Sequence, residues 1–176
     1  MLSKTCTLCK RELPLSAFGK HRIMKDGLSC WCKECSRERQ RKHSRTPQGI
    51  YTNIKSRQKY YKTHRDPSTK SFKITKEEFI KWYNTQEKEC VYCGIKEEEI
   101  GTSSDYFNDK GRRLTVDCKD NAQGYVLGNL VLACHKCNFI KSNIFTHEEM
   151  LEIGEKYLKP KLSLFRKTRD EEGKKC

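Results

Sequence analysis

The sequence has few apolar residues and no long apolar segment. Hydrophobic residues make up 35% of the 176-residue chain, and 34% of its residues are charged. No apolar run approaches the ~20 residues that cross a bilayer, and no apolar signal segment is present, so we expect neither a membrane-spanning nor a secreted protein. Because an apolar core from this composition would be thin, metal crosslinks would have to supplement it. We therefore expect a soluble protein of a reducing cytosol, with no membrane partner.

The chain contains eleven cysteines, and eight of them form four Cys-x-x-Cys pairs. In a chain without a signal segment, such pairs indicate metal ligands rather than disulfides. Tetrahedral zinc takes four thiolates, and two pairs together provide one such set. The two predicted structural Zn²⁺ sites consist of Cys6, Cys9, Cys32 and Cys35, and of Cys90, Cys93, Cys134 and Cys137.

One cysteine near the first set has no partner at this spacing. Cys30 is the spare thiol, and a zinc-ligand pair of Cys30 with Cys32 or with Cys35 stays open at this stage. Between the two pairs, Phe18 and Ile23 are expected core residues of a small module.

Positive charge is concentrated in the first third of the chain. Residues 1–63 hold 16 Lys and Arg against 4 Asp and Glu, a net +12 of the total +14. Ten basic residues against two acids lie between positions 33 and 62, enough to neutralise several phosphates. This segment is the expected polyanion-binding part, and a merely solvated basic surface is the alternative. The expected phosphate contacts are Arg37, Arg41, Lys55, Arg57 and Lys59.

Local signals predict several helices and a modular organisation. Residues 34–45 lack Gly and Pro, and Thr46-Pro47 starts a second predicted helix that runs to about residue 62. Capping boxes at Thr75 and Thr146 start two more, the latter ending at Pro160. We expect a zinc-binding basic module over 1–63, a second zinc module over 64–160 and a charged, frayed tail over 161–176.

Residues 112–143 form the expected centre of the second module. Residues 112–116 and 125–133 favour strands, with turn-forming Asn and Gly between them, and a short helix follows. Asp117 leaves the first strand and Asn138 falls where the helix would begin, so two oxygen ligands could converge on one cation. Asp117 as a plain turn former and Asn138 as a plain helix N-cap are the alternatives.

This pattern resembles the HNH (ββα-metal) nucleases, in which a hairpin and a helix together bind one divalent ion and the scissile phosphate. Three stretches carry the resemblance: Cys-x-Tyr-Cys-Gly-Ile at 90–95, Val-Asp-x-x-Asp and Gly-Tyr within 116–125, and Cys-Asn-Phe-Ile-Lys-Ser-Asn-Ile-Phe at 137–145. They look shared with small HNH restriction enzymes that carry two four-cysteine zinc sites. The resemblance implies an α+β fold in which a zinc module and basic helices precede a C-terminal ββα-metal module.

The resemblance also assigns roles to single residues. Asp117 and Asn138 would hold a catalytic Mg²⁺ or Mn²⁺, and Asn129 is the middle asparagine of the HNH pattern. Tyr92 stands where the proton acceptor would be, with packing over the zinc as the alternative. His64 would reach the phosphate, with a solvated linker position as the alternative.

One position departs from the family pattern. In the HNH family, the residue after the first-strand Asp is the histidine that activates water, and this chain has Cys118 there. In the small restriction enzymes that the chain resembles, this position looks like an arginine. An arginine can neutralise charge on the phosphate, and a neutral thiol cannot. We interpret Cys118 as a near-spectator thiol and Lys141 as a further phosphate contact.

Two functions are compatible with these observations. The resemblance implies a homodimeric, sequence-specific DNA endonuclease of restriction, homing or phage type, cutting duplex DNA in the cytoplasm of a bacterial or phage-infected cell. RNA stays open as a substrate. The alternative is a catalytically silent, zinc-containing DNA-binding protein on an HNH scaffold, because Cys118 replaces the general base. Retention of both Asp117 and Asn138 favours the enzyme.

Overall fold

The computed structural model describes residues 2–65, 71–100 and 113–173. The chain divides into two compact units, Met1–Asn53 and Ile54–Cys176, and the boundary falls inside a helix. The polar stretch expected to separate two modules includes residues 66–70, which lie outside the described residues. The module boundaries drawn from the sequence therefore stay a prediction.

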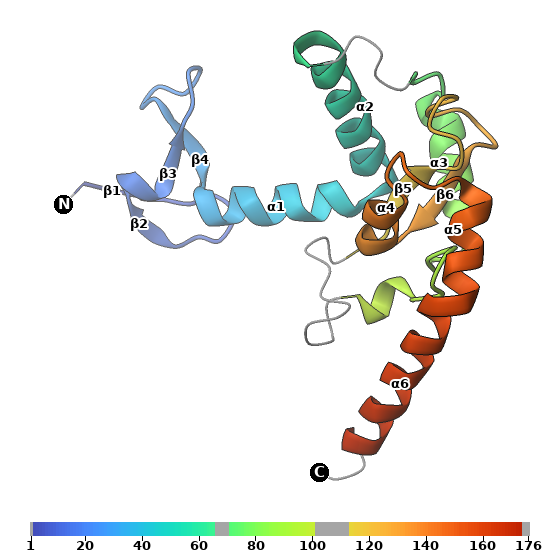
Figure 1. The fold of residues 1–176 in the computed structure, drawn as a ribbon. Coiled ribbons are helices and arrows are strands. Elements are labelled where there is room, and N and C mark those ends of the chain that lie inside the picture. The colour runs from blue at the N-terminus through green and yellow to red at the C-terminus, as the bar shows by residue number, and fades with distance from the viewer. Residues whose placement is uncertain (1, 66–70, 101–112, 174–176) are drawn as a thin grey trace. The chain divides into compact units, whose positions relative to one another are not determined.

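Two small hairpins and a helix make up most of the first unit (Figure 1). Strand β1 (Ser3–Thr5) pairs antiparallel with β2 (Glu12–Pro14), and β3 (Phe18–Lys20) pairs with β4 (Leu28–Cys32), with a 3₁₀ turn, η1 (Leu15–Ala17), between the hairpins. Phe18 is buried with Cys6 and Cys32, as expected for a core residue. Ile23 is 88% exposed, because it lies in the loop between β3 and β4, and its assignment to the core was wrong.

The two basic helices form where their sequence signals predict them. Helix α1 (Lys33–Arg45) begins directly after β4 and has no buried residue. Helix α2 (Pro47–His64) begins after Thr46, whose hydroxyl accepts a hydrogen bond from the Gly49 N–H at 3.1 Å. This is the expected N-cap, with proline at the first helical position where its missing N–H costs nothing.

The second unit contains the expected hairpin and helix. Strand β5 (Thr115–Cys118) pairs antiparallel with β6 (Leu130–Ala133), and α4 (His135–Lys141) follows directly. The mixed helix and strand fold expected from the sequence is confirmed. Two details differ. Asp117 lies within β5, opposite Val131, and the N-cap of α4 is Cys134, so Asn138 lies inside the helix and is not its N-cap.

Further helices complete the second unit (Figure 1). They are α3 (Lys76–Thr85), the 3₁₀ turn η2 (Glu97–Glu99), α5 (His147–Ile153), the π-helical turn η3 (Gly154–Leu158) and α6 (Lys159–Gly173). Both expected capping boxes are present, at Thr75 with Glu78 and at Thr146 with Glu149.

The prediction of a frayed tail after Pro160 was wrong, because α6 continues the helix to Gly173. Proline lacks the N–H of the regular helical bond, and here the wider π-helical turn η3 precedes it, with the Lys159 N–H bonded to Gly154 O. Leu162 is buried, and Arg166 donates two hydrogen bonds to the Glu99 carboxylate at 2.8 and 2.7 Å. These contacts hold α6 in place. The sequence of the tail, which is rich in charged residues, gave no indication of them.

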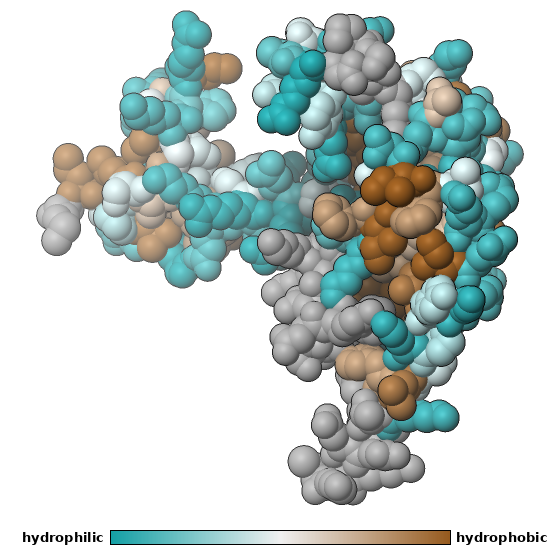
Figure 2. All heavy atoms as spheres, viewed as in Figure 1, coloured by the Kyte–Doolittle hydropathy of each residue, from teal (hydrophilic) through white to brown (hydrophobic). Residues whose placement is uncertain are grey.

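Apolar side chains gather on one side of the second unit, over α4 and the end of η3 (Figure 2). Phe139 is 78% exposed, and Ile144 and Tyr157 are also exposed.

None of the helices of the described residues combines the length and the hydropathy that a membrane-spanning segment requires.

Candidate functional site

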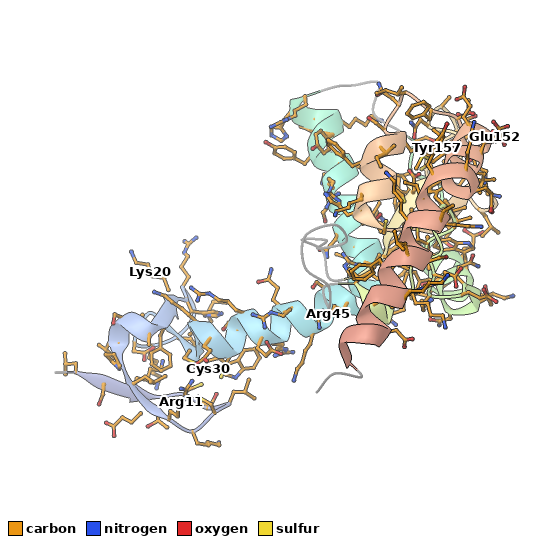
Figure 3. The ribbon with its side chains drawn as sticks, turned by 60° about the horizontal axis from the view of Figure 1, so that its bottom comes forward. Arg11, Lys20, Cys30, Arg45, Glu152 and Tyr157 are labelled. Carbon is orange, nitrogen blue, oxygen red and sulfur yellow. The ribbon has the colours of Figure 1, made fainter. Side chains whose placement is uncertain are left out.

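Each unit contains a cluster of four thiols. In both clusters, the four sulfur atoms lie within 4.8 Å of one another. The clusters consist of Cys6, Cys9, Cys32 and Cys35, and of Cys90, Cys93, Cys134 and Cys137, the two predicted sets. Cys30 lies in β4, in the first unit (Figure 3). It is not among the four thiols of the first cluster, so the alternative set that used it is not adopted. Both clusters could hold zinc.

The first pair of each cluster lies in a tight knuckle of the backbone. The carbonyl oxygen of Cys6 accepts from Lys10 N at 2.8 Å, and that of Cys90 accepts from Gly94 N at 2.8 Å. Lys10 and Gly94 both have positive φ, 61° and 73°, which closes the turn. Such a turn directs two sulfur atoms to one point.

The second pair of each cluster lies at a helix N-terminus, where the sequence predicted another knuckle. Cys32 and Cys134 are the N-cap residues of α1 and α4, and their sulfur atoms accept from Cys35 N and Cys137 N at 3.5 and 3.4 Å. The helix dipole and the free N–H groups favour a negative sulfur there. One knuckle and one helix N-terminus per cluster thus form two similar sites suited to zinc.

The second cluster fixes two of the predicted site residues at once. Tyr92 lies inside the knuckle, between Cys90 and Cys93, and Asn138 directly follows Cys137 in α4. Both residues are therefore attached to the same four-thiol cluster.

Asp117 lies in the interior, beside the tyrosine. The Tyr92 hydroxyl donates to Asp117 Oδ2 at 3.3 Å, and the Lys141 ammonium lies 3.4 Å from the same oxygen. The other oxygen, Oδ1, accepts the Cys118 N–H at 2.8 Å. Burial, followed by the charge of Asp117, raises the pKa of Tyr92, so its hydroxyl keeps its proton.

Asn138 contacts the same face of β5. Its Nδ2 donates to Thr115 Oγ1 at 3.0 Å, and Thr115 precedes Asp117 by two residues, which places both side chains on one face of the strand. Since nitrogen makes that bond, Oδ1 is the atom of the amide that could meet a cation. A carboxylate and an amide oxygen are the hard donors that Mg²⁺ and Mn²⁺ prefer, and the ammonium beside Asp117 shows that positive charge fits there.

His147 completes the group, and the sequence analysis did not single it out. Its Nδ1 lies 3.2 Å from the Tyr92 hydroxyl oxygen, and the two rings meet edge to face. Burial lowers the pKa of His147, which favours the neutral imidazole. In the sequence His147 is only the second residue of a capping box, a position that gives no signal of a role at the site.

A hollow of ≈ 560 Å³ opens beside these residues. Lys141, His147 and Asn129 line it together with residues of the β5–β6 loop and the start of α5. The hollow provides room for a group larger than a water molecule next to Lys141 and His147, two members of the group around Asp117.

Asn129 organises the β5–β6 loop. Its Nδ2 donates to Asp120 O and Gly124 O at 2.8 and 2.7 Å, and its Oδ1 accepts from Asp120 N at 3.0 Å. The structure therefore gives Asn129 a positioning task, holding the loop that borders the hollow.

The other predicted residues lie apart from Asp117 or are placed differently than expected. Within the described residues, His64 stacks on Tyr60 and its Nδ1 lies 3.2 Å from Tyr60 O, with no contact to Asp117. Cys118 is fully buried at the end of β5.

The five expected phosphate contacts of the basic helices are exposed: Arg37, Arg41, Lys55, Arg57 and Lys59. Lys141, the sixth, is buried.

The hairpin, the short helix and the two four-thiol clusters define a small α+β protein with two sites suited to zinc. No family model matches the chain, and no curated protein matches it. Among solved structures, the chain is similar to PacI, described as a rare-cutting HNH restriction endonuclease with an extraordinary mechanism of DNA perturbation. The similarity covers 86% of this chain and 90% of that chain, with 28% identity and a TM-score of 0.47. PacI is thus an HNH restriction enzyme, the kind of protein that the sequence motifs resemble.

Proposed function

We propose that this chain is a divalent-metal-dependent endonuclease that hydrolyses phosphodiester bonds of duplex DNA. The observation that carries the proposal is the group around Asp117, where a buried carboxylate, a tyrosine hydroxyl and a histidine imidazole meet beside a hollow. Perturbed pKa values in a group beside a cavity are typical of reactive sites.

Asp117 and Asn138 would hold the cation. Both side chains offer oxygen donors of the type that Mg²⁺ and Mn²⁺ prefer, and Asn138 contacts the face of β5 that carries Asp117. When bound there, such an ion polarises the scissile phosphate and stabilises the leaving oxygen.

Tyr92 and His147 would handle the proton of the attacking water. In the tautomer with a proton on Nδ1, His147 donates to the Tyr92 oxygen and Tyr92 donates to Asp117 Oδ2, which leaves Nε2 of His147 as the acceptor. The family resemblance assigned proton acceptance to Tyr92. Since the raised pKa of Tyr92 opposes that role, we assign acceptance to His147 and the positioning of its ring to Tyr92.

The basic helices would bind the DNA backbone. The five exposed Lys and Arg side chains of α1 and α2 can each neutralise a phosphate. The two four-thiol clusters would hold Zn²⁺ as structural ions with no open coordination position.

A homodimer is the proposed active form on duplex DNA. The two strands of a duplex run antiparallel and are related by two-fold symmetry at a palindromic site, and two copies of one centre match this symmetry. A sedimentation measurement of the molecular mass with and without DNA tests this proposal, and a monomer in both states would refute it.

Plasmid cleavage tests the main proposal. We expect wild-type protein to nick or linearise plasmid DNA with Mg²⁺ or Mn²⁺, and Asp117→Ala and Asn138→Ala to abolish cleavage while zinc content and DNA affinity are retained. A wild-type protein that holds its zinc and binds DNA but leaves plasmid intact with both ions would refute the proposal.

A DNA-binding protein without catalytic activity is the second candidate. The observation in its favour is the ion pair between Lys141 and Asp117, which gives the carboxylate a partner in the absence of any metal ion. Retained DNA binding without cleavage in the plasmid experiment would support this candidate.

A further inference from the structure

A lysine is buried at the centre of the proposed cation site. Lys141 has a side-chain exposure of 1% and its ion-pair partner Asp117 one of 5%. Its Nζ also donates to the carbonyl oxygen of Cys118 at 2.8 Å. A buried ammonium is held in this way only where partners offset the loss of hydration. Lys141 is thus part of the proposed site itself, whereas the sequence analysis interpreted it only as a phosphate contact.

The contacts of the carboxylate show what a metal ion would meet. Oδ1 of Asp117 is bonded to the Cys118 N–H, whereas Oδ2 faces both Tyr92 and the ammonium of Lys141. An ion that binds Oδ2 therefore arrives beside an existing positive charge. Two cations on one oxygen repel each other strongly in the protein interior, where water screens them little.

We infer that Lys141 is an internal counter-cation that competes with the divalent ion for Asp117 and thereby sets the affinity of the site. The inference rests on the proposed function only in taking Asp117 as a cation ligand. The ammonium balances the buried carboxylate when no ion is bound, which keeps the site assembled. An arriving ion displaces Nζ from Oδ2 toward the hollow that Lys141 also lines, where a phosphate would be bound.

Mn²⁺ binding to DNA-free protein tests the inference. Lys141→Met removes the charge and keeps an unbranched side chain, so we expect its affinity for Mn²⁺, measured by the paramagnetic signal of the free ion, to exceed that of wild type by about ten-fold or more. Asp117→Asn in the Lys141→Met background should remove this gain, which locates the bound ion at Asp117. Lys119→Met is the matched control, because Lys119 is an exposed lysine on the rim of the same hollow, and it should bind as wild type does.

A second measurement covers the case in which Lys141→Met fails to fold, as judged by its zinc content. In wild-type protein, the ¹⁵N resonance of the Lys141 ammonium should shift as Mg²⁺ saturates the site, and the resonance in Asp117→Asn should not respond. Equal or weaker Mn²⁺ binding by a folded Lys141→Met, or an unresponsive Lys141 resonance in the wild type, would overturn the inference.

The outcomes also separate this inference from the proposed function. Tighter Mn²⁺ binding in Lys141→Met with no DNA cleavage by wild type supports the counter-cation and refutes the nuclease. Cleavage by wild type with unchanged Mn²⁺ affinity in Lys141→Met supports the nuclease and refutes the counter-cation.

Discussion

Gly154 packs directly against the backbone of Tyr92. A Cβ atom built on Gly154 would lie 2.1 Å from the carbonyl oxygen of Tyr92 and 3.0 Å from its carbonyl carbon. His147 lies seven residues earlier, on the same face of the helix, and Met150 between them is fully buried. The close approach at Gly154 therefore sets the position from which His147 reaches the Tyr92 hydroxyl.

Replacement of Gly154 by alanine should disturb both stability and the site. The added methyl group must push the helix from the Tyr92 backbone, and such overpacking costs about 1–3 kcal/mol of unfolding free energy. We expect a lower midpoint of thermal unfolding and weaker plasmid cleavage. Gly19→Ala is the control, because nothing lies within 4 Å of a Cβ there. An unchanged midpoint in Gly154→Ala would contradict the observed packing.

Each chain should contain two tightly bound zinc ions. Cys90→Ser should lose one of them and unfold the second unit, because binding of a structural metal is coupled to folding. Cys30→Ser, outside both clusters, should keep both ions. Elemental analysis of protein purified without chelator measures this, and one zinc or none per wild-type chain would show the prediction to be wrong.

The proposed proton path predicts a ranking of variants. His147→Gln should reduce the cleavage rate by ~10² to 10⁴-fold, the usual contribution of a general base, and Tyr92→Phe should also reduce it because the imidazole loses its hydrogen-bond partner. Cys118→Ser should have a mild effect. His21→Gln, an exposed histidine of the first unit, is the control for the loss of an imidazole. If Cys118→Ser abolishes cleavage and His147→Gln does not, the assignment of the base is wrong.

Binding to duplex DNA should weaken steeply with salt. Charge reversals at Arg37, Arg41, Lys55 and Lys59 should weaken binding and reduce the salt dependence, since each contact releases counterions from a phosphate. Lys76→Glu, an exposed lysine at the start of α3, is the matched control. An affinity that stays flat between ~50 and ~200 mM salt would exclude these helices as the DNA-binding segment.

Most features that the sequence determined are local. The spacing of the cysteines predicted the four Cys-x-x-Cys pairs, and the four thiolates that zinc takes predicted how these pairs combine into two clusters. The Thr75 and Thr146 capping boxes predicted two helix starts. The interactions responsible are a side-chain cap on the N–H of the third helical residue and the backbone hydrogen bond that closes a knuckle. Both join residues that are only a few positions apart. Residue types and spacing are therefore sufficient to predict them.

The tertiary structure added His147 and the buried Lys141 to the group around Asp117, in which the family resemblance had already placed Tyr92 and Asn138. Tyr92 and Asp117 are 25 residues apart in the sequence, and Tyr92 and His147 are 55 apart. The contact between Tyr92 and His147 depends on how the helix packs on the knuckle at Gly154, a long-range relationship that no local pattern encodes. For the same reason the sequence did not indicate that Lys141 is buried: a lysine is usually exposed, and only the position of β5 against α4 shows that a carboxylate and a carbonyl oxygen offset its burial.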